Sequence, residues 1–322
     1  MKSCYRAELE KTVADVRAAG GDFIMTVVAD SHLDDALPAT REHLTEVNRA
    51  VCPDCLVHLG DFLNGNLPSA ISLHLLKEEM SGFRETADCP FLPVEGNHDG
   101  YCSGRQNDIV PDEFFDAAIL FTDGYPGLHR PKGKPYYYMD FPARRMRVVV
   151  LCSFHYRRRE DGRYVKRYGV DLPQIDWLKE EALACPPGYG IILCSHDTPF
   201  ARFTDDTIEA GEGMNENGAA LMDAVLDAKA QYGFDLIGWF VGHAHGDWMG
   251  VRRGISFVLI GSQTAYVPSL WDMTDGECGG SFAPRTPGTV TEDLFDCVTV
   301  DRTSRTVRLI RFGAGSDRVY RY

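Results

Sequence analysis

At 322 residues the chain is long enough to bury a large core, either as one large α/β domain or as two smaller ones. Its formal net charge of −14 argues against non-specific nucleic-acid binding as the main activity, and no apolar run approaches the ~20 residues that a membrane-spanning helix needs. Residues 1–21 are charged and lack the apolar run of a signal peptide, so the sequence predicts a cytoplasmic protein.

The first hundred residues alternate between strand and helix patterns. Short apolar, β-branched runs predict buried strands at 23–29, 56–59 and 91–94. Amphipathic segments predict helices near the N-terminus and at 38–51 and 68–83. This alternation indicates right-handed βαβ units and a mainly parallel sheet, in which ligands gather at the carboxyl ends of the strands.

The rest of the chain is less regular. Residues 101–134 are loop-like and too long for a bare connection, so we expect an insertion or lid over about 101–146. Further strands are predicted at 136–141, 147–152, 191–194, 236–241 and 255–260, and helices at 174–184 and 217–232. Two last strands predict a C-terminal β-hairpin and tail over 295–322. No repeat or linker interrupts the pattern, so we expect residues 1–322 to form a single domain.

Five polar clusters follow predicted strands. They are Asp30-Ser31-His32, Gly60-Asp61, Gly96-Asn97-His98-Asp99, Ser195-His196-Asp197 and Gly242-His243-Ala244-His245. Each alone could be an ordinary polar turn, but five in this order are hard to produce by chance. Imidazole and carboxylate groups suit borderline divalent metals, and a pair of ions ~3.5–4 Å apart needs a bridging carboxylate. Because residues two apart on extended backbone point the same way, Asp30 and His32 can converge on one metal. The two histidines of the last cluster can do the same.

This set of motifs resembles the five-motif signature of calcineurin-like metallophosphoesterases, and it spans residues 30–247. The resemblance implies a four-layer αββα sandwich, with two mixed β-sheets between outer helices and a dinuclear metal site at the carboxyl ends of the strands. It implies two ligand sets that share Asp61: Asp30, His32, Asp61 and His245 for one ion, and Asp61, Asn97, His196 and His243 for the other. Such mixed ligation suits Mn, Fe, Zn, Co or Ni rather than Ca.

The resemblance also implies hydrolysis of a phosphodiester or phosphomonoester of a small molecule or nucleotide. Two divalent cations lower the pKa of a bridging water, so that hydroxide forms near neutral pH and attacks phosphorus in line. His98 would then be a non-ligand imidazole that protonates the leaving oxygen, and Asp99 would orient His98 and raise its pKa. Protein Ser/Thr phosphatases of this superfamily carry Glu after the Asn-His pair, so Asp99 argues against that substrate class.

Other residues are weaker candidates. His155, Asn64 and Tyr266 could contact the substrate, but strand-end, turn and packing roles explain them equally well or better. Cys52 and Cys55 form a Cys-x-x-Cys that permits a redox role, although a helix-to-strand turn that happens to hold two thiols is the simpler interpretation.

Two wider questions stay open at this level. Residues 129–167 carry twelve Lys and Arg against three Asp and Glu, which fits either a solvated hairpin or a region that steers an anionic substrate. Some proteins with this fold have lost metal ligands and are catalytically silent binding scaffolds, but none of the ligands is missing here. The expected partner is a small anionic phosphoester, without a membrane or non-specific nucleic acid, and the oligomeric state is not predicted.

Overall fold

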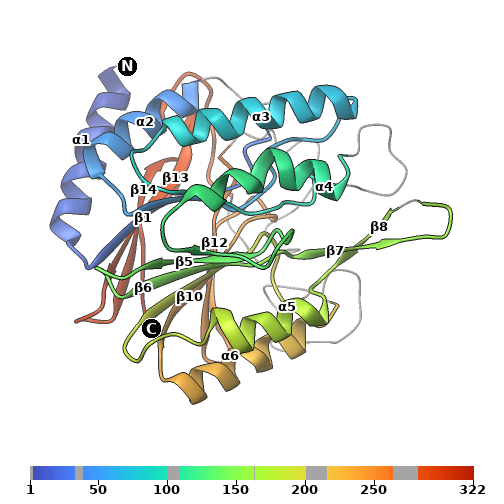
Figure 1. The fold of residues 1–322 in the computed structure, drawn as a ribbon. Helices are drawn as coiled ribbons and strands as arrows, with labels where there is room; N and C mark the ends of the chain where they lie inside the picture. The colour runs from blue at the N-terminus through green and yellow to red at the C-terminus, as the bar shows by residue number, and fades with distance from the viewer. Residues whose placement is uncertain (1–2, 33–38, 101–108, 163, 201–215, 264–281) are drawn as a thin grey trace.

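The computed structural model describes residues 3–32, 39–100, 109–162, 164–200, 216–263 and 282–322, and these form two large β-sheets between two groups of helices (Figure 1). On one side lie α1 (Ser3–Ala19), α2 (Ala39–Val51), α3 (Ser69–Glu85) and α4 (Pro111–Phe114), and on the other α5 (Leu172–Trp177) and α6 (Gly218–Tyr232). The predicted four-layer αββα arrangement is therefore confirmed.

The first sheet has six strands. Their spatial order is β15 (Arg318–Arg321), β14 (Thr306–Gly313), β13 (Leu294–Asp301), β1 (Phe23–Val28), β2 (Cys55–His58) and β3 (Phe91–Pro93). The strands β1, β2 and β3 run parallel, as the helix–strand alternation predicted. The hairpin of β13 and β14 joins β1 in antiparallel register, with Phe23 opposite Val300. The last three strands of the chain, β13, β14 and β15, therefore continue the sheet outward from β1.

The second sheet has seven strands. Their spatial order is β11 (Trp248–Arg252), β12 (Ile255–Leu259), β10 (Asp235–Val241), β9 (Gly190–Cys194), β6 (Met146–Val150), β5 (Tyr137–Phe141) and β4 (Leu128–His129). The four strands from β12 to β6 are parallel, and the outer ones are antiparallel. Both β4 and β5 fall within the segment 101–146 that was expected to be an insertion or lid, so part of that segment belongs to this sheet.

Several shorter elements complete the described residues. A separate two-stranded hairpin is made by β7 (Phe154–Arg158) and β8 (Tyr164–Tyr168). Short π-helical turns span Phe115–Ile119 and Leu178–Ala182, and 3₁₀ turns span Leu120–Gly124 and Val290–Glu292. In the part of the chain that is described, no helix combines the length and apolarity needed to cross a bilayer.

Alternate residues of the second sheet face two different hydrophobic cores. Val148 on β6 and its neighbour Ile192 on β9 pack into the core between the sheets. Val149 and Leu193 point the other way and pack with α5 and α6. This division follows the two-residue period of a strand. Because both faces are covered, the strands are almost continuously apolar, and this is the pattern that located them in the sequence.

Candidate metal centre

The predicted metal ligands come from both sheets and follow the carboxyl ends of five strands. Asp30 follows β1, Asp61 follows β2, Asn97 follows β3, His196 follows β9 and His243 follows β10. The remaining two, His32 and His245, lie two residues after Asp30 and His243. All seven side chains therefore lie at the edge where the two sheets meet, although their positions span more than two hundred residues of the chain.

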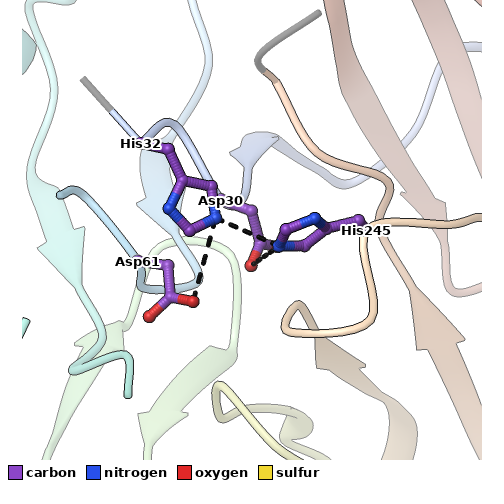
Figure 2. A group of neighbouring side chains, drawn as sticks. All are labelled: Asp30, His32, Asp61 and His245. Atoms are coloured by element: carbon purple, nitrogen blue, oxygen red, sulfur yellow. Dashed lines mark hydrogen bonds and ion pairs between the residues drawn. The ribbon is translucent and has the colours of Figure 1, made fainter. Parts of the chain in front are cut away.

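Four of these side chains form the first group of possible ligands. Asp30, His32, Asp61 and His245 each offer one atom, and the four atoms lie within 4.8 Å of one another. Figure 2 shows the four side chains pointing toward a common centre. His245 Nε2 lies 3.0 Å from His32 Nε2 and 3.5 Å from Asp30 Oδ1.

The second group adjoins the first through Asp61. Asp61, His196 and His243 again offer atoms within 4.8 Å of one another. Asn97 joins them, because its Oδ1 lies 2.9 Å from His196 Nε2 and 2.7 Å from His243 Nδ1. Asp61 Oδ2 is 3.3 Å from His196 Nε2 and 3.9 Å from His32 Nε2. One carboxylate oxygen thus faces both groups, which is where a bridging ligand would lie.

The donor set fits divalent cations. Nδ1 of His32 lies 3.1 Å from the Leu63 carbonyl, and Nδ1 of His196 lies 2.7 Å from the Leu59 carbonyl. A carbonyl only accepts, so each Nδ1 carries a hydrogen, and Nε2 is the nitrogen left to bind a cation. The two Nε2 atoms face other imidazole nitrogens, an amide oxygen and a carboxylate. Such a concentration of acceptors is stabilised by cations of the kind that imidazole and carboxylate bind.

The pKa shifts of the clustered side chains agree with this. Burial lowers the pKa of His243 and of His245 to about 3, so both imidazoles are neutral, as ligands must be. Burial opposes the ionisation of Asp61, but His196, with further help from His98, holds the pKa of that carboxyl well below its usual range. Burial also lowers the pKa of His196, yet the charge and hydrogen bond of Asp61 outweigh it and raise that pKa to about 10. Positive charge is thus favoured beside Asp61 Oδ2, the oxygen that faces both groups.

The backbone at the ligands differs from the prediction. We expected extended backbone at the Asp-x-His and His-x-His pairs. Instead, five of the predicted ligands have left-handed backbone, namely Asp30 (φ 52°), His32 (φ 44°), Asp61 (φ 55°), His243 (φ 73°) and His245 (φ 59°). The side chains still converge, but through tight turns that begin after the strands end. Each such residue costs of order 1–3 kcal/mol and persists only where the surroundings impose it.

Glycines let the ligand loops touch one another. Gly60 has φ +99°, and a Cβ there would lie 2.6 Å from His196 Nδ1 and 2.8 Å from the Cα of Gly96. A Cβ on Gly96 would lie 2.0 Å from the Asp61 amide nitrogen. The turns after β2 and β3 are thus in backbone contact, and this contact brings the carboxylate of Asp61 beside Asn97.

Comparison with known proteins decides the family. The family model described as calcineurin-like phosphoesterase matches residues 25–247, which contain all five motifs. The chain belongs to the calcineurin-like phosphoesterase family. No curated protein matches it.

Two solved structures have a similar fold to this calcineurin-like phosphoesterase. A dimetal phosphatase from Danio rerio aligns with a TM-score of 0.60 at 15% identity, covering 94% of this chain and 100% of the other. A structure of PhoD aligns with a TM-score of 0.56 at 13% identity, covering 93% of this chain and 69% of the other. At such identities the likeness concerns the fold alone.

Asp99 has a different role from the one predicted. Its Oδ2 accepts hydrogen bonds from the backbone amides of Asp61 and Gly96, at 2.8 and 2.9 Å. Its Oδ1 accepts from the amides of Phe62 and Leu63, at 2.8 and 3.2 Å. The prediction that Asp99 orients the His98 imidazole is therefore wrong. This buried carboxylate fixes the loop that carries Asp61.

His98 is held by backbone groups instead. Its Nδ1 lies 2.7 Å from the carbonyl of Asn64, and its amide donates to Asp61 Oδ1 at 2.8 Å. Its Nε2 lies 4.0 Å from Asp61 Oδ2, and the side chain is 26% exposed. The imidazole thus borders the two ligand groups with Nε2 facing them, and it is absent from both groups in the described part of the chain.

The three weaker candidates have separate outcomes. Asn64 contributes its backbone carbonyl to His98, as just described. His155 lies on β7, and its Nε2 is 3.1 Å from a carboxylate oxygen of Glu216, a residue just before α6, so this histidine has a charged partner. Tyr266 lies outside the described residues.

The basic segment 129–167 divides into two parts. Its earlier arginines make local ion pairs, as Arg147 does with Asp140 at 2.7 Å. Four of its later basic residues, Arg157, Arg158, Lys166 and Arg167, lie on β7 and β8, and Lys166 Nζ donates to the backbone carbonyl of Asn97 at 2.7 Å. Sequence reasoning missed Lys166 as an individual residue, and the only signal for it was the run of positive charge.

Two other clusters identified from sequence or structure differ from the metal centre. Cys52 is exposed, and burial raises the pKa of Cys55 well above its usual range, which disfavours the thiolate that redox chemistry requires. A third group of possible ligands, His43, Glu292 and Asp293, shares no residue with the metal centre. There His43 Nδ1 lies 2.6 Å from Asp293 Oδ2 in a buried hydrogen bond.

Proposed function

We propose that this protein hydrolyses phosphoester bonds with two divalent metal ions. Asp30, His32 and His245 would hold one ion, Asn97, His196 and His243 the other, and Asp61 would bridge them. The substrate is a small anionic phosphodiester or phosphomonoester, and the ions come from Mn, Fe, Zn, Co or Ni.

One observation carries the proposal: Asp61 Oδ2 faces a nitrogen of each ligand group, 3.3 Å from His196 and 3.9 Å from His32. A structural ion pair would need only one of these contacts. Two acceptor-rich groups that share a carboxylate are the arrangement that a pair of cations requires. When bound, the two ions activate water and neutralise charge on the phosphoryl oxygens.

The protein's own residues supply positioning and a proton. Asp99 holds the loop of Asp61, and the His98 amide fixes Asp61 Oδ1, which leaves Oδ2 directed at both groups. The Asn64 carbonyl keeps hydrogen on His98 Nδ1, so Nε2 is the atom that meets the substrate. In its protonated form His98 gives the Nε2 proton to the leaving oxygen as the ester bond breaks.

The first experiment separates an enzyme from a scaffold. Turnover of bis-p-nitrophenyl phosphate and of p-nitrophenyl phosphate is measured with Mn²⁺, with and without a chelator. We expect turnover that the chelator abolishes, and the preferred ester distinguishes a phosphodiesterase from a phosphatase. No turnover of either ester together with no bound metal would favour the catalytically silent scaffold and refute the proposal.

The second experiment tests His98 as the acid. His98→Ala should keep its metal content but lose activity by a factor of about 10²–10⁴ with an alkyl leaving group. The loss should be smaller with p-nitrophenol, because that leaving group departs as an anion without a proton. His74→Ala is the matched control, since His74 lies on α3 with its side chain 71% exposed. Equal losses with both leaving groups would exclude proton donation.

A further inference from the structure

The hairpin of β7 and β8 rises from the edge of the metal centre. It follows β6, whose last residue pairs with Cys194, two residues before the ligand His196. The Phe154 ring lies 6.0 Å from the His196 ring, and the Tyr168 ring lies 6.5 Å from the His243 ring. From there the two strands extend away from both large sheets (Figure 1).

One face of this hairpin is an anchor. Cross-strand pairing places His155 opposite Arg167, and Arg157 on the same face. All three side chains contact the carboxylate of Glu216, at 2.9 to 3.1 Å. Glu216 precedes α6, so it fastens the hairpin to the body of the protein. On this face one carboxylate is thus shared by two guanidinium groups and an imidazole.

The other face alternates aromatic and cationic side chains. The register pairs Phe154 with Tyr168, Tyr156 with Lys166 and Arg158 with Tyr164, so all six side chains share one face. At its base this face touches the loop that carries Asn97 and His98. Tyr156 donates to Glu95 at 2.6 Å, and Lys166 donates to the Asn97 carbonyl.

Two positions on this face, Lys166 and the Arg158–Tyr164 pair, could contact different parts of one ligand. Lys166 Nζ lies 4.3 Å from the centre of the Phe154 ring and has one hydrogen bond in the described part of the chain, so two of its three N–H groups can still donate. The outer pair stands two residue steps further along the ribbon, about 7 Å away. There the Arg158 guanidinium lies over the half-buried Tyr164 ring, 5.9 Å from its centre.

We propose that this face of the β7–β8 hairpin binds a nucleotide as the substrate of the metal centre. Lys166 holds a phosphate oxygen beside Asn97, and the Arg158–Tyr164 pair holds the base. Aromatic rings with adjacent cations are the arrangement that binds nucleobases next to phosphates. The net charge of −14 favours a mononucleotide ester over a long nucleic acid. This inference rests on the proposed phosphoesterase function and specifies its substrate class.

The test compares two substrates with the same leaving group, the p-nitrophenyl ester of thymidine 5′-monophosphate and methyl p-nitrophenyl phosphate. Tyr164→Ala should lower kcat/KM for the thymidine ester about tenfold and leave the methyl ester nearly unchanged, because only the thymidine ester carries a base. Tyr164→Phe should restore the loss. Lys166→Met should lower kcat/KM for both esters about tenfold, chiefly through KM, since both carry the phosphate. Val165→Ala, on the anchored face, is the matched control.

The outcomes distinguish this inference from the function on which it rests. Turnover of both esters with equal effects of Tyr164→Ala would overturn the nucleotide inference and leave the phosphoesterase intact. If neither ester is hydrolysed, the phosphoesterase proposal fails. Binding affinities measured by calorimetry then test whether the hairpin binds a nucleotide. Thymidine monophosphate should then bind more tightly than 2-deoxyribose 5-phosphate in the wild type but not in Tyr164→Ala, and equal binding would overturn the inference. Stronger competition by an oligothymidylate, molecule for molecule, would refute the mononucleotide assignment.

Discussion

Asp99→Asn should destabilise the protein although it changes only one atom. Each oxygen of the Asp99 carboxylate accepts hydrogen bonds from two backbone amides, Oδ2 from Asp61 and Gly96 and Oδ1 from Phe62 and Leu63. An asparagine keeps one oxygen but replaces the other with an NH₂ group, which cannot accept. Whichever way the amide turns, two buried backbone donors lose their partner and face another donor.

The size of the effect follows from that count. A buried donor left without a partner costs about 1–3 kcal/mol, so two of them cost about 2–6 kcal/mol. The free energy of unfolding is about 5–15 kcal/mol for a typical domain, so the loss is a large part of the total. Burial and the charge of Asp61 raise the pKa of Asp99 to about 7. The measurement is therefore made at pH 8, where the carboxyl is ionised.

Asp197→Asn is the matched control for this experiment. Asp197 is also buried and also adjoins a predicted ligand, and its Oδ1 accepts from the Thr198 amide at 2.7 Å. Its Oδ2 has no hydrogen-bond partner among the described residues, so an asparagine NH₂ group at that place would not face a hydrogen-bond donor. Urea unfolding of the metal-free proteins should show a lower midpoint for Asp99→Asn and no loss for Asp197→Asn. Equal midpoints would refute the assignment of Asp99 as the residue that fixes the Asp61 loop.

Two further changes test the site and its support. Asp61→Asn removes the shared carboxylate, so elemental analysis after metal loading should find half the wild-type metal content or less, and unchanged content would contradict a bridging role. His58→Gln tests the pH dependence of stability. Burial, together with the charge of His196, holds the pKa of His58 well below 6.5. As the pH falls through about 6.5, His58 takes up a proton in the unfolded chain but not in the folded one. Its contribution to the free energy of unfolding is therefore fully present above pH 6.5 and is lost in acid. The wild type should lose about 1.4 kcal/mol more per pH unit below 6.5 than His58→Gln, and equal slopes would show that His58 is protonated in the folded state.

Among the strands, the sequence predicted those that are buried on both faces and missed several that are not. The strands that precede the five motifs are almost continuous apolar runs, because helices cover one face and the other sheet covers the second. The strands β7 and β8 contain mainly tyrosine, arginine and lysine, and within the described residues each pairs only with the other. Without a buried face they have no apolar alternation, so nothing in the pattern distinguished them from a charged loop. The two-residue β4 is too short for any periodicity.

The sequence allowed the residues of the site to be predicted. It did not allow prediction of the backbone groups that hold these side chains in place. An Asp or His after a strand is visible in the sequence. The Asp99 contact is not, because it joins this carboxylate to backbone amides of a loop more than thirty residues away, and backbone amides have no residue-specific signature. The same holds for His98, whose imidazole is positioned by the carbonyl of Asn64. Main-chain partners of this kind become apparent only when the loops are placed side by side.

The left-handed backbone at five of the predicted ligands connects residue type with site geometry. Strand periodicity assumes extended backbone, and on that assumption the pairs at 30 and 32 and at 243 and 245 were expected to point the same way. In the structure the strands end first, and the ligands occupy turns with φ between 44° and 73°. Aspartate and histidine are among the few residues, glycine aside, that enter this region with some frequency, whereas β-branched residues do so rarely. The ligand types therefore satisfy two requirements, to bind a cation and to allow the turn that presents it. A substitution by a β-branched residue that keeps an oxygen ligand, such as Asp30→Thr, would disfavour the left-handed turn even where its oxygen could bind the cation.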